Sequence, residues 1–182
     1  MLKIIIPEVE LYDSEKNEFI NIKRQELLLE HSLMSISKWE SKWKKPFLVK
    51  EARTRDETID YVRCMTINRD IDPVVYKGLT NEALAEINKY IEDPMTATWF
   101  SDKNKRPSNP NGEVVTAELI YYWMVALNIP FECQKWHLNK LLTLIRVCDI
   151  KNSGGKKMSK MATSRQYREL NAARRKAMKT KG

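Results

Sequence analysis

The sequence predicts an α+β fold in which helices dominate, with a small β-hairpin or three-stranded sheet at the N-terminus and a basic, partly helical tail at the C-terminus. Strand-like segments lie in residues 1–30, whereas apolar residues at helical spacing recur between 31 and 150. Lys and Arg are concentrated after residue 150. We therefore expect a single mixed domain over residues 1–150 and a mobile tail over residues 151–182.

Two segments with strand character predict the β-rich start of the chain. Leu2–Ile6 is rich in β-branched residues, and Glu18–Ile22 alternates apolar with polar residues. The polar connector 13–17 lies between them. This arrangement predicts a hairpin in which the two segments pair, and Leu27–Leu29 can add a third strand.

Residues 31–100 predict a series of helical segments, each with a start signal ahead of apolar residues at helical spacing. The start signals are Ser32 before a helix to about Lys44, a capping box of Thr54 and Glu57, Asp72–Pro73 before a short turn closed by Gly78, and Thr80 before a helix that Asp93–Pro94 ends.

The second half of the domain begins with a polar stretch. Residues 101–112 read SDKNKRPSNPNG and contain two prolines and almost no apolar residue, which predicts an exposed loop. Residues 113–150 predict a helical hairpin, because Thr116 and Glu118 begin one helix and Pro130 separates it from the next. The second helix carries an apolar stripe that consists of Leu138, Leu141, Leu142, Ile145 and Cys148.

Composition indicates a globular intracellular protein. The apolar fraction is 42% and the charged fraction 31%, which is close to the values of ordinary folded domains. No stretch approaches the roughly 18 apolar residues of a membrane span, and Met1–Glu10 lacks the pattern of a signal peptide, so we expect neither insertion nor secretion. The cysteines Cys64, Cys133 and Cys148 are odd in number and widely spaced, which favours reduced thiols in a cytosolic protein.

Charge is distributed unevenly along the chain. The net charge is +8, but residues 151–182 contain eleven Lys or Arg against the single acid Glu169, which leaves residues 1–150 at about −2. The basic residues are interleaved with Ala, Leu and Tyr, a pattern typical of a cationic amphipathic helix. Such a tail can bind nucleic acid or an acidic protein surface, or it can remain solvated. The basic candidates are Lys156, Lys157, Lys160, Arg165, Arg168, Arg174, Arg175 and Lys176.

Candidate catalytic and metal-binding groups do not form a complete set. Cys133 and His137 are four residues apart and could share a helix face, but two ligands are too few for structural zinc. His31 is flanked by Glu30 and Ser32, and adjacent residues cannot converge as a hydrolytic triad does. We therefore expect no catalytic residue and no metal site.

Phosphate-binding motifs are also incomplete. The nearest approach is Gly154–Lys157, which follows a helix and lacks the strand, loop and helix context of a phosphate cradle. The sequence therefore predicts a protein without a cofactor, and one that is not an enzyme.

Five tryptophans are the remaining candidates for a binding surface. Rigid aromatic side chains are enriched at interfaces, but they also pack in cores. Trp123 lies in a strongly apolar helix, which favours a core position, whereas Trp39 lies in the polar context Ser-Lys-Trp-Glu-Ser. Both the interface and the core interpretation remain open for Trp39 and Trp43. The partner-binding candidates are Trp39, Trp43 and Trp99.

Five blocks of the chain together resemble a known family. They are LLLEHSLMSISKWESKWKKPF, ETIDYVRCMTI, YIEDPMTATWF, AELIYYWMVALNIPFECQKWHLNKLLTLIRVC and RELNAARRKAMKTKG. In this order they are similar to a family of tail morphogenesis proteins of tailed bacteriophages, and the similarity extends over nearly the whole chain from about Glu26. The family resembles the tail assembly chaperones of siphoviruses, whose genes lie between those of the tail tube and tape measure proteins.

The resemblance implies a non-enzymatic protein of the host bacterial cytoplasm that binds the tape measure protein or other tail proteins. A tape measure protein is long and largely helical, so its chaperone needs apolar and aromatic surface rather than an active site. The basic tail can assist in binding acidic stretches. Two alternatives remain: a structural or connector component of the phage tail, or an accessory protein whose basic tail binds nucleic acid weakly and in a salt-dependent way.

Overall fold

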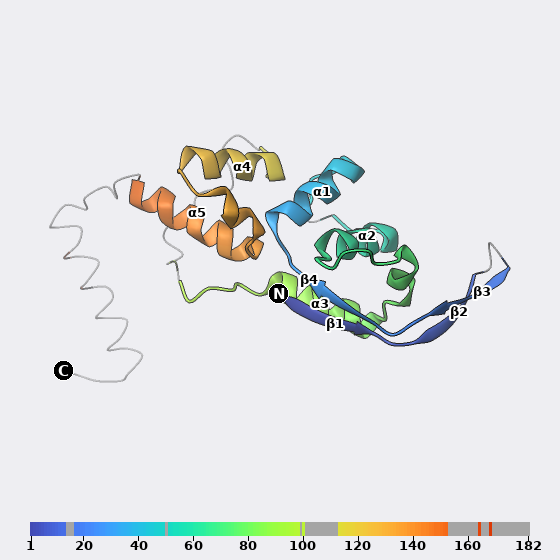
Figure 1. The fold of residues 1–182 in the computed structure, drawn as a ribbon. Coiled ribbons are helices and arrows are strands. Elements are labelled where there is room, and N and C mark those ends of the chain that lie inside the picture. Colours follow the sequence, from blue (N-terminus) through green and yellow to red (C-terminus); the bar gives the residue numbers. More distant parts are fainter. Residues whose placement is uncertain are drawn as a thin grey trace, which may run out of the picture. The chain divides into compact units, whose positions relative to one another are not determined.

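The computed structural model describes residues 1–13, 17–49, 51–98, 100, 113–152, 164 and 168 (Figure 1). The chain divides into two compact units, Met1–Ile145 and Arg146–Gly182. The strands are β1 (Leu2–Ile6), β2 (Val9–Asp13), β3 (Glu18–Ile22) and β4 (Gln25–Leu29). The α-helices are α1 (Leu33–Trp43), α2 (Arg55–Met65), α3 (Asn81–Glu92), α4 (Ala117–Ala126) and α5 (Leu138–Asn152), and the 3₁₀ helices are η1 (Pro73–Gly78) and η3 (Phe131–Lys135). The predicted α+β class with dominant helices is confirmed.

The strands pair differently from the predicted hairpin. β1 pairs antiparallel with β4, with Leu2 opposite Leu29, and β2 pairs with β3, with Asp13 opposite Glu18. The predicted pairing of β1 with β3 is wrong, because β2, a strand that the pattern did not indicate, takes that place. The third predicted strand is confirmed within β4, although each of the two sheets has two strands.

The two sheets are successive parts of one hairpin. Pro7 and Glu8 separate β1 from β2, and Lys23 and Arg24 separate β3 from β4. Both sheets keep the same register, so the interruption inserts no extra residue. Proline lacks the N–H that a ladder requires, which explains why pairing stops at this point. In Figure 1 the β2–β3 ribbon continues beyond the β1–β4 sheet.

Helix α1 is central among the helices of the first unit, because it packs against α2, α4 and η3. The β1–β4 sheet buries alternate side chains from both strands, which is the expected pattern for a sheet with one covered face. Core side chains include Ile4, Ile6, Leu27, Leu29, Leu33, Ile36, Trp39, Val62, Met65, Ile120, Met124, Leu138, Leu141 and Ile145.

The predicted helix starts are confirmed by their capping bonds. The side chains of Ser32, Thr54, Asp72, Thr80 and Thr116 each accept a hydrogen bond from a backbone N–H of the first turn that follows. At Thr54 the full capping box is present. These side chains satisfy amides that a helix leaves without partners at its start, so they fix where each helix begins.

Two later segments form backbone hydrogen bonds with the residues that directly follow β4. The backbone N–H of Glu30 donates to the carbonyl oxygen of Met65 over 2.9 Å, and that of Leu138 donates to the carbonyl oxygen of His31 over 2.7 Å. The first bond fixes the end of α2, and the second fixes the start of α5. As a result, His31 lies next to His137 although the two residues are far apart in the sequence.

The buried carboxylate of Glu40 joins α1 to the start of α4. Its Oε1 atom accepts a hydrogen bond from the backbone N–H of Phe47 over 2.7 Å, and its Oε2 atom accepts one from that of Ala117 over 2.8 Å. Ala117 is the first residue of α4, where a negative charge also interacts favourably with the helix dipole. Glu40 therefore positions α4 against α1.

In the second unit, α5 continues to Asn152, and Ser164 and Arg168 are helical and exposed. The predicted loop at 101–112 and the rest of the predicted tail after Asn152 lie outside the described residues. Within the part of the chain that the structure describes, no helix is both long enough and apolar enough to cross a membrane.

Candidate partner-binding surfaces

Trp39 belongs to the core, so the prediction that it anchors a partner on the surface is wrong. Its side chain is 2% exposed, and its ring packs edge-on against Phe47 with centroids 5.2 Å apart. The indole Nε1 donates a hydrogen bond to the carbonyl oxygen of Glu57 over 2.9 Å. The polar sequence around Trp39 was misleading because Ser35 and Glu40, which share its side of α1, are buried too.

Trp43 is half-buried and lies at the edge of the same aromatic cluster. Its ring stacks on that of Trp39 with centroids 6.2 Å apart, and its Nε1 donates to Oδ2 of Asp60 over 2.9 Å. The other carboxylate oxygen of Asp60 forms an ion pair with Lys42. These contacts fix the position of the Trp43 indole, and part of the indole remains accessible to solvent. Trp99, the third candidate, lies outside the described residues.

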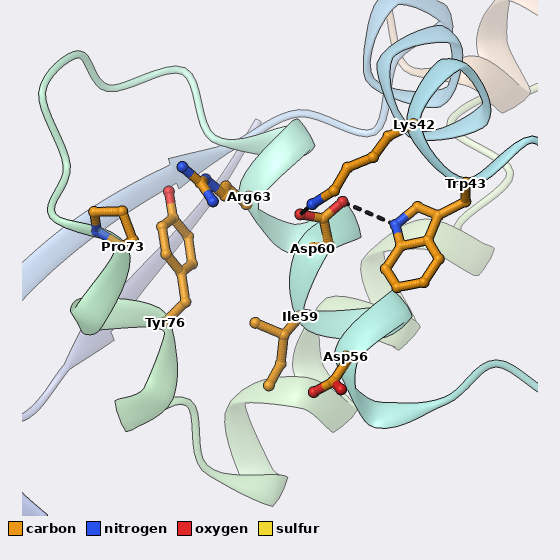
Figure 2. A pocket seen from close by; sticks show the side chains of 8 residues that line it. All are labelled: Lys42, Trp43, Asp56, Ile59, Asp60, Arg63, Pro73 and Tyr76. Atoms are coloured by element: carbon orange, nitrogen blue, oxygen red, sulfur yellow. Dashed lines mark hydrogen bonds and ion pairs between the residues drawn. The ribbon is translucent and has the colours of Figure 1, made fainter. Parts of the chain in front are cut away.

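A pocket of about 330 Å³ lies beside Trp43 (Figure 2). Figure 2 shows Trp43 and Tyr76 on opposite sides of Ile59, so these three side chains contribute apolar surface to the pocket. Its lining residues are Lys42, Trp43, Asp56, Ile59, Asp60, Arg63, Pro73 and Tyr76.

The charged groups of this pocket divide into two kinds. Asp60 is buried and engaged by both Trp43 and Lys42, which gives it a structural role. Arg63 and Asp56 are exposed, and neither belongs to an ion pair within the described ranges. The described residues that line this pocket show no arrangement of a nucleophile and a base.

An exposed aromatic surface lies on α4 and η3. We define the α4 aromatic surface by Tyr121, Tyr122, Val125 and Phe131. Tyr122 is 65% exposed, and Val125 and Phe131 are more than half exposed. The rings of Tyr121 and Phe131 have centroids 6.4 Å apart, which makes the surface continuous from the helix to the segment after it.

The sequence contains a signal for this surface that the predicted sites do not use. In the segment AELIYYWMVA the only charged residue is Glu118, which lies one turn before Tyr122 on the exposed side, and the other positions are apolar or aromatic. A helix of this kind is usually covered on all sides. Here Ala117, Ile120 and Met124 are buried and Trp123 is half-buried, whereas Tyr122 and Val125 are exposed on the side that also carries Glu118.

The two histidines have structural partners. The Nδ1 atom of His31 and the hydroxyl of Tyr61 share a hydrogen bond of 2.5 Å, and Nε2 of His137 bonds to the carbonyl oxygen of Tyr90 over 3.0 Å. Burial lowers the pKa of both imidazoles, and the neighbouring His137 and Arg53 lower that of His31 further, to about 3. The rings are therefore neutral near pH 7 and contribute to the core.

No metal-binding group of three or more His, Cys, Asp or Glu side chains is present among the residues that the structure describes. His137 directs Nε2 at a backbone carbonyl, and Cys133 is a buried free thiol. The hydroxyl of Ser32 accepts the N–H of Ser35 as a helix cap, so it does not face His31 as a nucleophile would. The basic candidates other than Arg168 lie outside the described residues.

The chain matches no family model, no curated protein and no solved structure.

Proposed function

We propose that this protein is a non-enzymatic phage tail morphogenesis factor, a tail assembly chaperone that binds the tape measure protein in the cytoplasm of the bacterial host. The sequence resemblance supplies the role. The observation that carries the proposal is the α4 aromatic surface, where an apolar helix and the segment after it leave large side chains in solvent. It replaces Trp39 as the main expected contact with the client.

The chemistry of this surface suits a helical client. Exposed Tyr and Phe side chains offer rigid apolar area at a small cost in conformational entropy, and their burial releases roughly 25 cal/mol for each Å² of apolar surface removed from water. The apolar face of an amphipathic helix in the tape measure protein is a suitable occupant. The pocket beside Trp43 can hold one further side chain of the same client.

Hydrogen bonding inside the protein also favours binding over catalysis. Among the described residues, every buried side-chain nitrogen or oxygen has a hydrogen-bond partner within the chain. The buried carboxylate of Glu40 holds two backbone amides, and that of Asp60 holds Trp43 and Lys42. These groups hold elements of the fold together, which is a structural role.

Co-expression tests the proposal. The tape measure protein of the same phage should remain in the soluble fraction when this protein is present and should aggregate when it is absent. Replacing Tyr122, Val125 and Phe131 with serine should abolish this effect without changing the thermal unfolding midpoint, because all three side chains are exposed. Ile67→Ser, at an exposed position outside this surface, is the matched control and should leave the client soluble.

Two results would contradict the proposal. If purified virions contain many copies of the unaltered chain, the protein is a structural component of the tail, because a chaperone leaves the assembled particle. If the client is equally soluble with the serine variant, the α4 aromatic surface is not its binding site. Nucleic-acid binding through the basic tail stays a separate prediction, and a steep fall in affinity with rising salt would identify it.

A further inference from the structure

The outer part of the long hairpin is a second uncovered surface. We call it the β2–β3 arm and define it by Val9–Asp13 and Glu18–Ile22. Its base packs on η1, where Gly78 lies next to the side chains of Val9 and Ile22. Because this sheet has two strands, each strand has one open edge with backbone N–H and C=O groups available for pairing. A two-stranded ribbon without further cover is marginally stable in water.

An aromatic pair occupies one face of this arm. Tyr12 lies opposite Phe19 across the two strands, and the ring centroids are 5.1 Å apart. Tyr12 is 54% exposed and Phe19 is 69% exposed. Adjacent exposed rings attract Lys and Arg side chains, because the face of an aromatic ring is electron-rich.

The charged residues of the arm are all acidic, and the cations Lys23 and Arg24 lie just beyond its base. Glu10 shares the face of Tyr12 and Phe19, whereas Glu18, the neighbour of Phe19 along β3, lies on the other face. Glu8, Glu10 and Glu18 are exposed, and none of them belongs to an ion pair in the part of the chain that the structure describes. The rest of the sequence supplies the complementary charge, since residues 151–182 contain eleven Lys or Arg against one acid. One protein therefore carries both an acidic, aromatic arm and a strongly basic segment.

We propose that the β2–β3 arm binds the basic segment 151–182 of a second copy of this chain. Carboxylates of the arm pair with Lys and Arg of the segment, and the rings of Tyr12 and Phe19 receive further cations. When the basic segment of each copy binds the arm of the other copy, both arms are occupied and the two copies are related by two-fold symmetry. No free arm then remains to add a third copy, so the assembly stops at a dimer.

This inference is independent of the proposed function, because the α4 aromatic surface and the arm belong to different elements of the fold. Loss of self-association would leave client binding through α4 in place. Conversely, a failure to bind the tape measure protein would not affect the dimer.

Sedimentation velocity of the full chain tests the proposal. At about 0.05 M salt the protein should form a concentration-dependent dimer, and at about 0.5 M salt its dissociation constant should rise by about tenfold or more, because exposed ion pairs are screened. A monomer at every protein concentration in low salt would overturn the proposal. So would a dimer whose dissociation constant does not change with salt.

A charge swap identifies the two contacting segments. Glu10→Lys with Glu18→Lys should weaken the dimer by about tenfold, and so should Arg174→Glu with Arg175→Glu. A chain that carries all four substitutions should regain the dimer, because each new charge again faces its opposite. Glu118→Lys, an exposed position on α4, is the control and should have no effect. If the combined variant stays monomeric, the two segments do not pair.

The aromatic contribution has its own variant. Tyr12→Ala with Phe19→Ala should weaken the dimer by about three- to tenfold, because each cation–π contact at an exposed site is weak. The matched control is Tyr122→Ala, which removes an equally exposed tyrosine from the α4 aromatic surface. An equal effect of the control would show that the copies associate through α4 and would overturn the assignment to the arm.

Discussion

The imidazole rings of His31 and His137 meet edge to face, with centroids 5.0 Å apart, inside the core. They are the only histidines in the chain, and they come from the end of β4 and the start of α5. The hydroxyl of Tyr61 bonds to His31, whereas His137 bonds to the carbonyl of Tyr90 through Nε2 and accepts the backbone N–H of Asn139 at Nδ1. Two neutral rings fit this arrangement, whereas two protonated rings would repel each other.

The free energy of unfolding should therefore fall as the pH falls below about 6.5. An unfolded chain binds protons on its histidines at the ordinary pKa of 6.5, whereas the folded pKa of His31 is lowered to about 3 by burial, then by His137 and Arg53. Between these values the unfolded state binds more protons, so protons favour unfolding by up to about 1.4 kcal/mol for each pH unit and histidine. Urea unfolding at pH 7 and pH 4.5 measures the difference.

The control for this dependence is the variant His31→Gln, which removes one of the two titrating rings. Its stability at pH 7 should be lower, because the packing changes, but its loss between pH 7 and pH 4.5 should be smaller than that of the original chain. An unchanged loss would assign the pH dependence to other groups.

Trp39→Ala should lower the free energy of unfolding by about 3–5 kcal/mol, because it removes a fully buried ring and leaves the carbonyl of Glu57 without its indole donor. Trp43→Ala should cost less, since Trp43 is half-buried. Equilibrium unfolding in urea compares the two variants. An equal loss of unfolding free energy in the two variants would mean that the deeper burial of Trp39 does not determine its contribution to stability.

Glu40→Ala should lower the free energy of unfolding by about 2–4 kcal/mol. The substitution leaves the buried backbone amides of Phe47 and Ala117 without an acceptor, and the cost of an unsatisfied buried amide exceeds the value of the bond itself. Glu118→Ala, at an exposed position of α4, should change stability by less than about 0.5 kcal/mol. Thermal unfolding that ranks the two variants in the opposite order would refute this role for Glu40.

Gly78→Ala should destabilise the protein by about 1–3 kcal/mol through overpacking. A Cβ atom at this position would lie 2.9 Å from Cγ2 of Ile6 and 3.3 Å from Cδ1 of Ile22, and both side chains are buried. Differential scanning calorimetry measures the shift in melting temperature. An unchanged melting temperature would mean that the two isoleucines move apart freely.

Local signals in the sequence predicted the helix starts, because a capping side chain bonds to amides within three residues of itself. Thr54 with Glu57 and Thr80 with Ala83 illustrate this. The strand Val9–Asp13 was harder to predict, since its acidic residues lower strand propensity and its partner lies beyond a connector.

Which aromatic side chains are exposed for partner binding depends on contacts between segments that are distant in the sequence. Trp39 is buried because α1 packs against α2, and the sequence around the tryptophan does not reveal which side of α1 that contact covers. In α4 the difficulty is different. The only polar marker of its solvent side is Glu118, which shares a helix side with Tyr122 and Val125, and a single charge among apolar residues is a weak signal of exposure.

The common register of the two sheets has a consequence for synthesis on the ribosome. All four strands precede α1, so a nascent chain can pair its strands before any helix has been made. The face with Ile4 and Leu27 then stays open to water until later elements have been translated, among them α3, which contacts β1. Since paired strands without a covered face are marginally stable in water, the hairpin gains stability only when these later elements pack against it, so an apolar face is exposed during that interval.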